Sequence, residues 1–268
     1  MSKQKYIVAW VSLLLGCLLL IINSIGFIMG PVVNTNLKGR KPVSNYDYRT
    51  LILADANHQF SELLKKNISP EDKARGLFEL ISRSFIHTPS EYRIKAGDNW
   101  IMWLGGTLFD RRYFKSQDPD FLWKKGGGFC SQAAIIFVAK GKELGLKTRL
   151  IGLKGHVVAE VYLPDKGWRM VDPDMGIFWD HDLDSFGVNP SEEQVKSELL
   201  ARGHSEKISR HFSRIYVSQE NNSRNEYPTA PNRFFLEKVC NWLKWLIPLG
   251  LICFSWQTGR VSYRLKYP

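Results

Sequence analysis

The sequence predicts a mixed domain of helices and strands held between two apolar, membrane-spanning helices. Both ends of the chain carry long apolar runs. The centre carries a buried helix followed by three strand-like segments joined by turn residues. A chain of 268 residues leaves about 200 residues for a packed domain once the apolar ends are set aside.

The first apolar run, residues 6–29, contains no charged residue. Its length matches the ~30 Å of hydrocarbon that a helix must cross in a bilayer. Lys3 and Lys5 precede it, so we expect residues 1–5 to be cytoplasmic. A cleaved signal peptide is the alternative. We favour an uncleaved anchor, because the run is long and no clean small-x-small cleavage site follows it.

The second apolar run covers residues 239–256 and is weaker, because Asn241 and Lys244 interrupt it and Pro248 favours a kink. A helix lying on the membrane surface is the alternative to a spanning helix. We favour spanning, with residues 257–268 as a basic cytoplasmic tail. Two spans with both ends inside place the region between them on the extracytoplasmic, periplasmic side.

The region between the spans reads as a linker, residues 30–50, and one domain, residues 51–235. A helix is expected over residues 50–66. Ser69 is an expected N-cap with proline at the first helical position, and the helix that follows is expected to end near Ile86.

The centre of the domain is the most readable part of the sequence. A buried helix is expected from residue 130 to 143, ended by Gly145. The other expected elements are a short buried helix at Trp100–Leu104, strands at 147–152, 156–163 and 168–172, a helix near 190–202 that begins with Asn189-Pro190, and irregular chain over 203–232.

The charge balance of the chain indicates which kinds of partner and cofactor are not expected. Six of the 37 basic residues lie in the terminal segments, which leaves 31 basic and 26 acidic residues in the middle region. That balance is modest and no basic face is interleaved with aromatics, so no nucleic-acid partner is expected. The acidic and histidine residues of 180–184 fit no standard ligand spacing, and neither a metal nor another cofactor is expected.

Cys130 is the one cysteine outside the apolar end segments. A cysteine at the start of a buried helix meets unpaired backbone N–H groups and a partial positive charge, which stabilise a thiolate. The same N–H groups form half of an oxyanion hole, and the glycines up to Gly128 let substrate approach closely. The alternative is a small buried hydrophobic residue.

His156 and Asp172 stand at the start of one expected strand and the end of the next. An aspartate that accepts from an imidazole fixes its tautomer, provided both side chains share a face of the sheet. A two-residue turn would place them on opposite faces, so we predict an odd-length loop or a bulge, with Gly167 as the natural bulge site. Asp174, two residues later, would lie on the same face as Asp172 and is the alternative carboxylate for orienting His156.

Residues 126–179 resemble the transglutaminase-like family. The family pattern has small residues before a cysteine, a helix ending in Leu-Gly, an arginine strand, a histidine strand with glutamate, then Gly-Trp and Val-Asp-Pro. The matching residues here are Cys130, Leu144, Gly145, Arg149, His156, Glu160, Gly167, Trp168, Asp172 and Pro173. The chain resembles more loosely the small bacterial members with cell-envelope or exopolysaccharide functions.

The resemblance implies an α+β, papain-like core in which the cysteine helix packs on an antiparallel sheet. It implies Cys130 as nucleophile, His156 as general base and acid, and Asp172 as the residue that orients the imidazole. The family's second oxyanion donor lies upstream of the cysteine. Trp123 is the expected residue for that role, followed by Trp100, with Gln132 last.

The leading hypothesis is a membrane-anchored cysteine enzyme acting on the amide carbonyl of a protein or peptide through an acyl-enzyme. Water as acceptor makes it a peptidase or amidase, and an amine makes it an acyltransferase; the sequence does not choose between them. Two alternatives stay open. One is a non-catalytic domain that binds peptide or glycan among cell-envelope or polysaccharide-export proteins, and the other is an assembly factor that acts through its spans.

Overall fold

The structure is a computed structural model that describes residues 3–30, 51–87, 92–218, 220, 222–225 and 230–266. From residue 31 on, the predicted linker of residues 30–50 lies outside the described residues. The chain forms two compact units, one built from residues 1–31, 93–116 and 232–268 and the other from residues 32–92 and 117–231. The first is called the helical unit here and the second the sheet unit.

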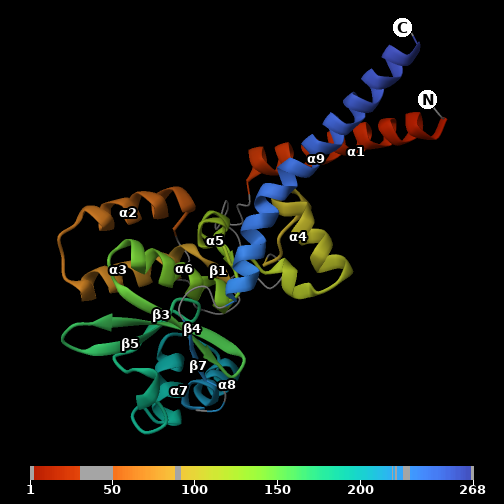
Figure 1. The fold of residues 1–268 in the computed structure, drawn as a ribbon. Coiled ribbons are helices and arrows are strands. Elements are labelled where there is room, and N and C mark those ends of the chain that lie inside the picture. Colours follow the sequence, from red (N-terminus) through yellow and green to blue (C-terminus); the bar gives the residue numbers. More distant parts are fainter. Residues whose placement is uncertain are drawn as a thin grey trace. The chain divides into compact units, whose positions relative to one another are not determined.

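The sheet unit contains a five-stranded antiparallel sheet in the order β6-β5-β4-β3-β7 (Figure 1). Its strands are β3 (Lys147–Leu153), β4 (His156–Leu163), β5 (Gly167–Asp172), β6 (Ile177–Phe178) and β7 (Ser223–Asn225). Two shorter strands, β1 (Ile86–His87) and β2 (Gly127–Gly128), pair in parallel outside this sheet.

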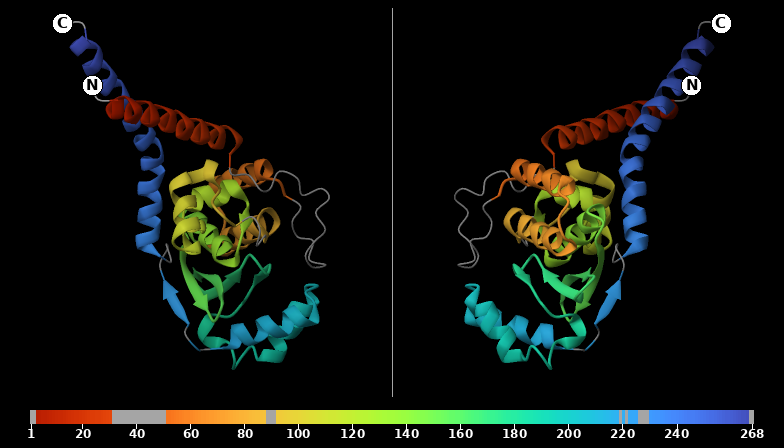
Figure 2. Two further views of the ribbon diagram at one scale, coloured as in Figure 1. Left: turned by 90° about the vertical axis from the view of Figure 1, so that its right-hand side faces the viewer. Right: turned by 90° about the vertical axis from the view of Figure 1, so that its left-hand side faces the viewer.

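Helices cover both faces of the sheet (Figures 1 and 2). One face carries α2 (Leu53–Lys65), α3 (Pro70–Ser84), α5 (Pro119–Lys125) and α6 (Cys130–Glu143). The other face carries the 3₁₀ turn η2 (Leu183–Ser185), α7 (Glu192–Ala201) and α8 (Glu206–Val217). The predicted core, in which the helix that begins with Cys130 packs on an antiparallel sheet, is confirmed.

Alternating side chains along the strands divide the apolar interior into two clusters. Ala159 and Val161 of β4 lie in the cluster under α6, whereas Val158 lies in the cluster under α7 and α8. A strand that is buried on both faces is apolar at successive positions, which is why β4 reads as a nearly continuous apolar run.

Local signals in the sequence set several element ends. The Ser69 hydroxyl accepts the backbone N–H of Asp72 at 3.1 Å and so caps α3. Gly145 follows α6 with φ of +78°, a conformation that favours glycine. The prediction that α3 ends near Ile86 is two residues too long, because β1 begins at that residue.

The turn between β4 and β5 decides whether His156 and Asp172 lie on the same face of the sheet. Leu163 pairs with Gly167, so the loop between them has three residues, and Gly167 takes φ of +72°. A three-residue loop closed by a left-handed glycine is a standard hairpin connection. This odd loop length places His156 and Asp172 on the same face, as the sequence predicted.

Two expectations about the later part of the chain are wrong. Residues 203–232 are not irregular, since they contain α8 and β7, and β7 pairs with β3. The preceding helix begins at Glu192 instead of near Pro190, because the Ser191 hydroxyl and the Gln194 side chain cap each other's backbone N–H groups.

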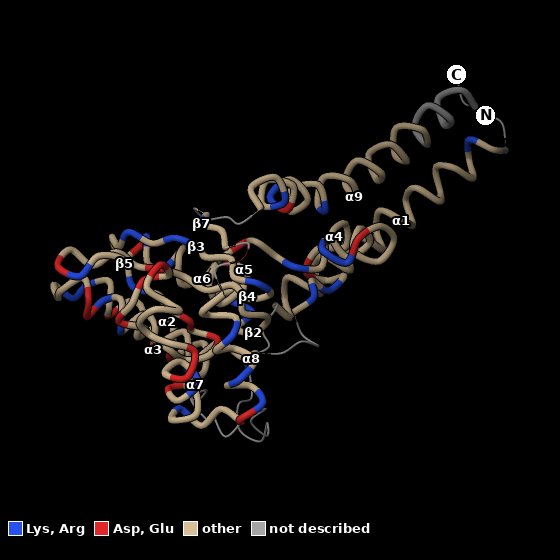
Figure 3. The backbone as a smooth tube through the Cα atoms, turned by 90° about the horizontal axis from the view of Figure 1, so that it is seen from below, with Lys and Arg blue, Asp and Glu red and all other residues tan. Residues whose placement is uncertain are grey.

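The helical unit contains α1 (Lys3–Met29), α4 (Ala96–Leu108), the 3₁₀ turn η1 (Arg111–Phe114) and α9 (Pro231–Lys266). Two stretches are long and apolar enough to cross a membrane, Gln4–Met29, which contains an 18-residue window of mean hydropathy 2.5, and Pro231–Thr258, which contains one of 1.3. Figure 3 shows α1 uncharged beyond its first turn. Only 11% and 17% of the two stretches is buried, so neither is the core helix of a globular domain.

The expected short buried helix around Trp100–Leu104 is α4, but its burial was predicted wrongly. Trp103 and Leu104 are exposed, whereas Met102 and Gly106 are buried on the opposite face. The predicted domain of residues 51–235 also spans this segment, whereas residues 93–116 pack within the helical unit. The predicted domain boundaries stay predictions.

Replacing Gly167 by alanine tests the turn. We expect Gly167→Ala to lower the free energy of unfolding by about 1 kcal/mol, because a Cβ strains the left-handed conformation although it meets no atom within 4 Å. Thermal unfolding of the purified chain checks this, with the exposed loop residue Asp165→Ala as the control. Equal midpoints for the two variants would contradict the role of Gly167.

Candidate functional site

Cys130 is the first residue of α6 and is half-buried. The chain reaches it through Gly126, which ends α5 in the left-handed conformation, and through the short strand β2. Phe129 precedes the helix, and its backbone N–H donates to Oε1 of Gln132 at 3.0 Å. These contacts hold the sulfur at the amino end of the helix, where the first backbone N–H groups have no intrahelical partner.

Gly128 is required by the packing of this turn. A Cβ at Gly128 would lie 2.0 Å from Oε1 of Gln132 and 3.3 Å from the ring of Phe85. The side of Gly128 where a side chain would stand therefore faces the protein interior, and its predicted contact with substrate stays a prediction.

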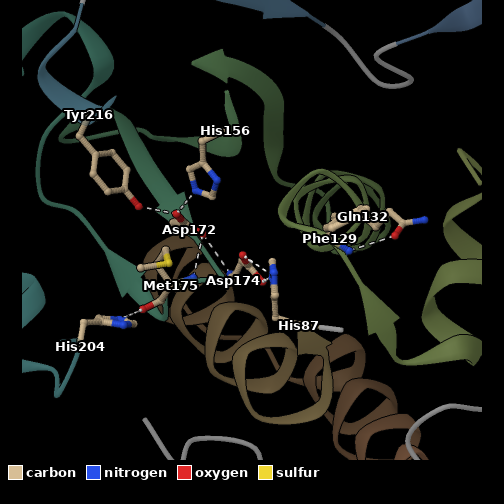
Figure 4. A network of polar contacts seen from close by, with 9 residues as sticks. All are labelled: His87, Phe129, Gln132, His156, Asp172, Asp174, Met175, His204 and Tyr216. Atoms are coloured by element: carbon tan, nitrogen blue, oxygen red, sulfur yellow. Dashed lines mark hydrogen bonds and ion pairs between the residues drawn. The ribbon is translucent and has the colours of Figure 1, made fainter. Parts of the chain in front are cut away.

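His156 opens β4 and is buried, with 3% of its surface exposed. Its Nε2 lies 2.5 Å from Oδ2 of Asp172 at the end of β5 (Figure 4). The ring of Phe212 packs edge-on against the imidazole at a centroid distance of 4.9 Å. The imidazole is thus held by a carboxylate on one side and by an aromatic ring on another, which leaves Nδ1 for Cys130.

Asp172 is fully buried, and both of its carboxylate oxygens are bonded. Oδ2 faces Nε2 of His156 and accepts from the hydroxyl of Tyr216. Oδ1 accepts from the backbone N–H groups of Asp174 and Met175, both at 3.0 Å. Burial by itself raises the pKa of this carboxyl, but the charge and hydrogen bonds of its partners outweigh burial and bring the pKa below its ordinary value.

The pKa of His156 is raised well above the ordinary imidazole value. Burial acts in the opposite direction, and the Asp172 carboxylate outweighs it by charge and by hydrogen bonding. Cys130 adds to the rise in the pKa of His156, as a hydrogen-bond partner and through the negative charge of its ionised form. The site therefore favours an imidazolium placed between a sulfur and a carboxylate.

Tyr216 supplies a contact that the sequence did not predict. It lies on α8, is fully buried, and its hydroxyl donates to Asp172. Burial raises the pKa of Tyr216 well above its ordinary value, and the nearby Asp172 charge raises it further, so the hydroxyl keeps its proton. The rings of Trp179 and Phe186 pack against it at centroid distances of 5.6 and 5.9 Å.

A second histidine and carboxylate pair lies beside the first (Figure 4). Nδ1 of His87 lies 2.8 and 2.9 Å from the two carboxylate oxygens of Asp174, which is buried. His87 is the β1 residue paired with Gly128, and its ring lies 6.0 Å from that of Phe129. Asp174, the alternative carboxylate in the sequence argument, therefore binds His87, while Asp172 binds His156.

His204 supports the loop that follows Asp172. Its Nε2 lies 3.0 Å from the carbonyl oxygen of Met175, the residue whose N–H donates to Asp172. Burial lowers the pKa of His204, which favours the neutral ring that donates to a carbonyl.

The two tryptophans proposed as oxyanion donors each donate their indole N–H to another group in the protein. The indole N–H of Trp123 donates to Oδ1 of Asn57 at 2.6 Å within the core, and that of Trp100 donates to the carbonyl of Lys244. Figure 4 shows the Gln132 amide on the opposite side of α6 from His156. The N–H of Trp123 thus has a partner within the core, and its role as oxyanion donor stays a prediction.

Tyr216 and His87 were not predicted as site residues, and the sequence around them differs in how clearly it indicates their place. Ile208, Phe212, Ile215 and Tyr216 follow helical spacing after the Ser205 cap, so α8 was readable. Nothing local marks His87, because its partners come from β2 and from the loop after β5.

The arrangement brings together a thiol, an imidazole and a buried carboxylate. Within the described part of the chain, no group of three His, Cys, Asp or Glu residues is placed to hold a metal ion. The sulfur and the imidazole are groups suited to attack on a carbonyl followed by proton transfer.

Comparison with known families agrees with this geometry. Residues 79–173 match the model of the transglutaminase-like superfamily, and this segment contains Cys130, His156 and Asp172. The match covers about a third of the chain. No curated protein matches the sequence.

Removing the Tyr216 hydroxyl tests the support of Asp172. We expect Tyr216→Phe to lower the free energy of unfolding by about 1–3 kcal/mol at pH 7, since a buried carboxylate loses a donor. The pKa of Asp172 is lowered in the folded state, so this stabilisation is present above about pH 4 and is lost as the pH falls through the folded pKa. Denaturant unfolding at pH 7 and pH 3 measures it.

Tyr162→Phe is the matched control, because that ring is exposed on β4. A loss in Tyr216→Phe no larger than in this control at pH 7 would contradict the proposed support.

The titration of His156 can be followed by NMR of the chain labelled at histidine. We expect its midpoint well above about 6.5 in wild type and at a lower pH in Asp172→Asn, because the carboxylate that opposes burial is gone. The stability that His156 contributes is complete below about pH 6.5 and is lost as the pH rises through its folded pKa. His156→Gln assigns the signal, and a midpoint unchanged in Asp172→Asn would contradict the coupling.

Proposed function

We propose, from the transglutaminase-like domain at residues 79–173, that this chain is a membrane-anchored cysteine enzyme that acts on amide carbonyls. The observation that supports it most is the position of His156. Its imidazole lies between the Cys130 sulfur and the buried carboxylate of Asp172, and both raise its pKa. A histidine with no catalytic role does not require a buried carboxylate and a thiol as its two partners.

In the first half of the proposed reaction, the thiolate of Cys130 attacks the carbonyl carbon of the substrate amide. The carbon–sulfur bond forms and the carbonyl oxygen becomes an oxyanion. The imidazolium of His156 then gives its proton to the amide nitrogen, the carbon–nitrogen bond breaks, and the amine leaves. Cys130 now carries the acyl group, and His156 is neutral.

In the second half, an acceptor attacks the acyl-enzyme. Neutral His156 takes a proton from the acceptor, the carbon–sulfur bond breaks, and the thiolate and imidazolium form again. Water as the acceptor gives a peptidase or amidase. A primary amine gives transamidation of a protein or peptide.

Asp172 and its partners act on the imidazole throughout both halves. The carboxylate accepts from Nε2 of His156, so the proton exchanged with substrate is carried on Nδ1, the nitrogen left for the sulfur. The backbone N–H groups at the start of α6 are the proposed donors to the oxyanion, since they lie at the helix end that favours negative charge.

The membrane anchor is part of the proposal. The apolar helices α1 and α9 stand at the two ends of the chain. Lysines precede the first and a basic tail follows the second, which by the positive-inside rule places both termini in the cytoplasm and the sheet unit on the periplasmic side. Substrates would then be cell-envelope proteins or peptides.

Labelling by a thiol-directed electrophile tests the nucleophile. In a background with Cys17, Cys240 and Cys253 replaced by serine, we expect rapid modification of Cys130 at pH 7 and none after Cys130→Ala. His156→Ala should slow the modification by about 10²-fold or more, because the thiolate–imidazolium pair is lost. Rates are measured by intact-mass spectrometry.

The matched control for the imidazole is His58→Ala, a histidine exposed on α2. Modification of Cys130 at the same rate in wild type and in His156→Ala would refute the proposal. If Cys130→Ala fully complements a deletion of the chromosomal copy, the sheet unit acts instead as a binding domain for peptide or glycan.

A further inference from the structure

Residues 93–116 interrupt the sheet unit and pack in the helical unit. They fall inside the segment that matches the family model, between β1, which carries His87, and β2, which leads to Cys130. Within this insert, no charged residue occurs from Asn99 to Phe109. Charged residues stand on both sides of the uncharged stretch, Asp98 before it and Asp110, Arg111 and Arg112 directly after it.

Close backbone contact joins the insert to α1. A Cβ at Gly26 of α1 would lie 1.8 Å from the carbonyl oxygen of Gly97, so the two backbones touch. The same occurs between α1 and α9, where a Cβ at Gly16 would lie 2.8 Å from the carbonyl oxygen of Pro248. Close approach at small residues is characteristic of helices that associate in membranes.

The insert also completes the hydrogen bonding of α9. Pro248 has no N–H, so the carbonyl of Lys244 four residues earlier lacks its intrahelical donor. Asn23 of α1 donates to that carbonyl at 2.5 Å, and the indole of Trp100 in α4 donates at 3.3 Å. In a bilayer each unsatisfied backbone group costs several kcal/mol, so such replacement donors are expected there.

Two further polar contacts join the same elements. The ammonium of Lys244 donates to the carbonyl of Asp98 at 2.6 Å, and the side chain of Asn99 donates to that of Asn241 at 2.9 Å. Asn99 also accepts from the backbone N–H of Met102 and so caps the part of α4 that follows the kink at Asn99. The polar groups at the start of α4 are thereby turned toward α9.

The rest of α4 is apolar on its outer face as well as its inner one. Met102 and Gly106 are buried against η1, yet Trp103, Leu104, Leu108 and Phe109 are 38%, 37%, 67% and 83% exposed. A helix that is apolar all round is stable only inside protein or lipid. The backbone of α4 is non-helical at Asn99, where φ is −160° and ψ is 97°, and the helix after this kink is about 14 Å long, too short to cross ~30 Å of hydrocarbon.

We infer that residues 93–116 form a third membrane-contacting element, with α4 lying in the interfacial layer of the bilayer that α1 and α9 cross. Its outer side chains Trp103, Leu104, Leu108 and Phe109 contact lipid, and the arginines after it lie at the headgroups. The occupant is lipid because α4 contacts two helices of the same unit that are long and apolar enough to cross a membrane. This inference rests on the proposed membrane anchoring.

The test places an environment-sensitive fluorescent amino acid at single positions of the full chain, one chain per phospholipid nanodisc. Position 109 reports α4, and position 254, a half-exposed phenylalanine of α9, reports a spanning helix. Position 188, a valine 87% exposed in the sheet unit, is the matched control for an apolar exposed residue. Quenching is measured with lipids brominated on their acyl chains.

We expect blue-shifted emission at positions 109 and 254, both quenched by brominated lipid, and water-like, unquenched emission at 188. Emission at 109 that matches 188 while 254 is quenched overturns the inference and leaves the anchoring intact. Blue-shifted but unquenched emission at 109 also overturns it, because protein would then cover α4. If 254 is unquenched too, the proposed anchoring fails and the inference fails with it, whereas labelling of Cys130 still tests the chemistry separately.

Discussion

The buried carboxylate of Asp172 is the interaction on which the arrangement of the site depends. An ionised carboxylate out of water costs several kcal/mol unless its oxygens are bonded. Here the imidazole of His156, the hydroxyl of Tyr216 and two backbone N–H groups share the two oxygens. These donors come from β4, α8 and the loop after β5, so one charge holds three elements in a single geometry.

The loop after β5 also supports the turn that leads to Cys130. Asp174 donates its backbone N–H to Asp172 and binds His87 through its carboxylate. His87 pairs with Gly128, two residues before Cys130. The loop that bonds to Asp172, the partner of His156, therefore also contacts the turn that carries Cys130. Three strand residues of the family pattern contact one another within the sheet. Arg149 forms an ion pair with Glu160, and its guanidinium stacks on the ring of Trp168.

In the helical unit, too, a polar group is bonded by side chains from distant parts of the chain. A proline in α9 leaves one carbonyl without its donor, and side chains from α1 and α4 replace it. In both units a polar group that its own element leaves unpaired is satisfied by neighbours far along the chain. These replacement bonds specify which elements associate, whereas apolar burial alone is non-directional.

What the sequence by itself determined was local or periodic. The apolar runs, the Ser69 cap, the helix of Cys130, the alternation along β4 and the odd turn before Gly167 depend on residues close in the chain. Contacts between distant segments were decided only by the tertiary structure. The Tyr216 hydroxyl on Asp172, the His87 pair, the use of Trp123 by Asn57 and the outward face of α4 depend on packing and register. The identity of a residue does not determine which distant residue it contacts, because the position of that residue depends on how other segments fold.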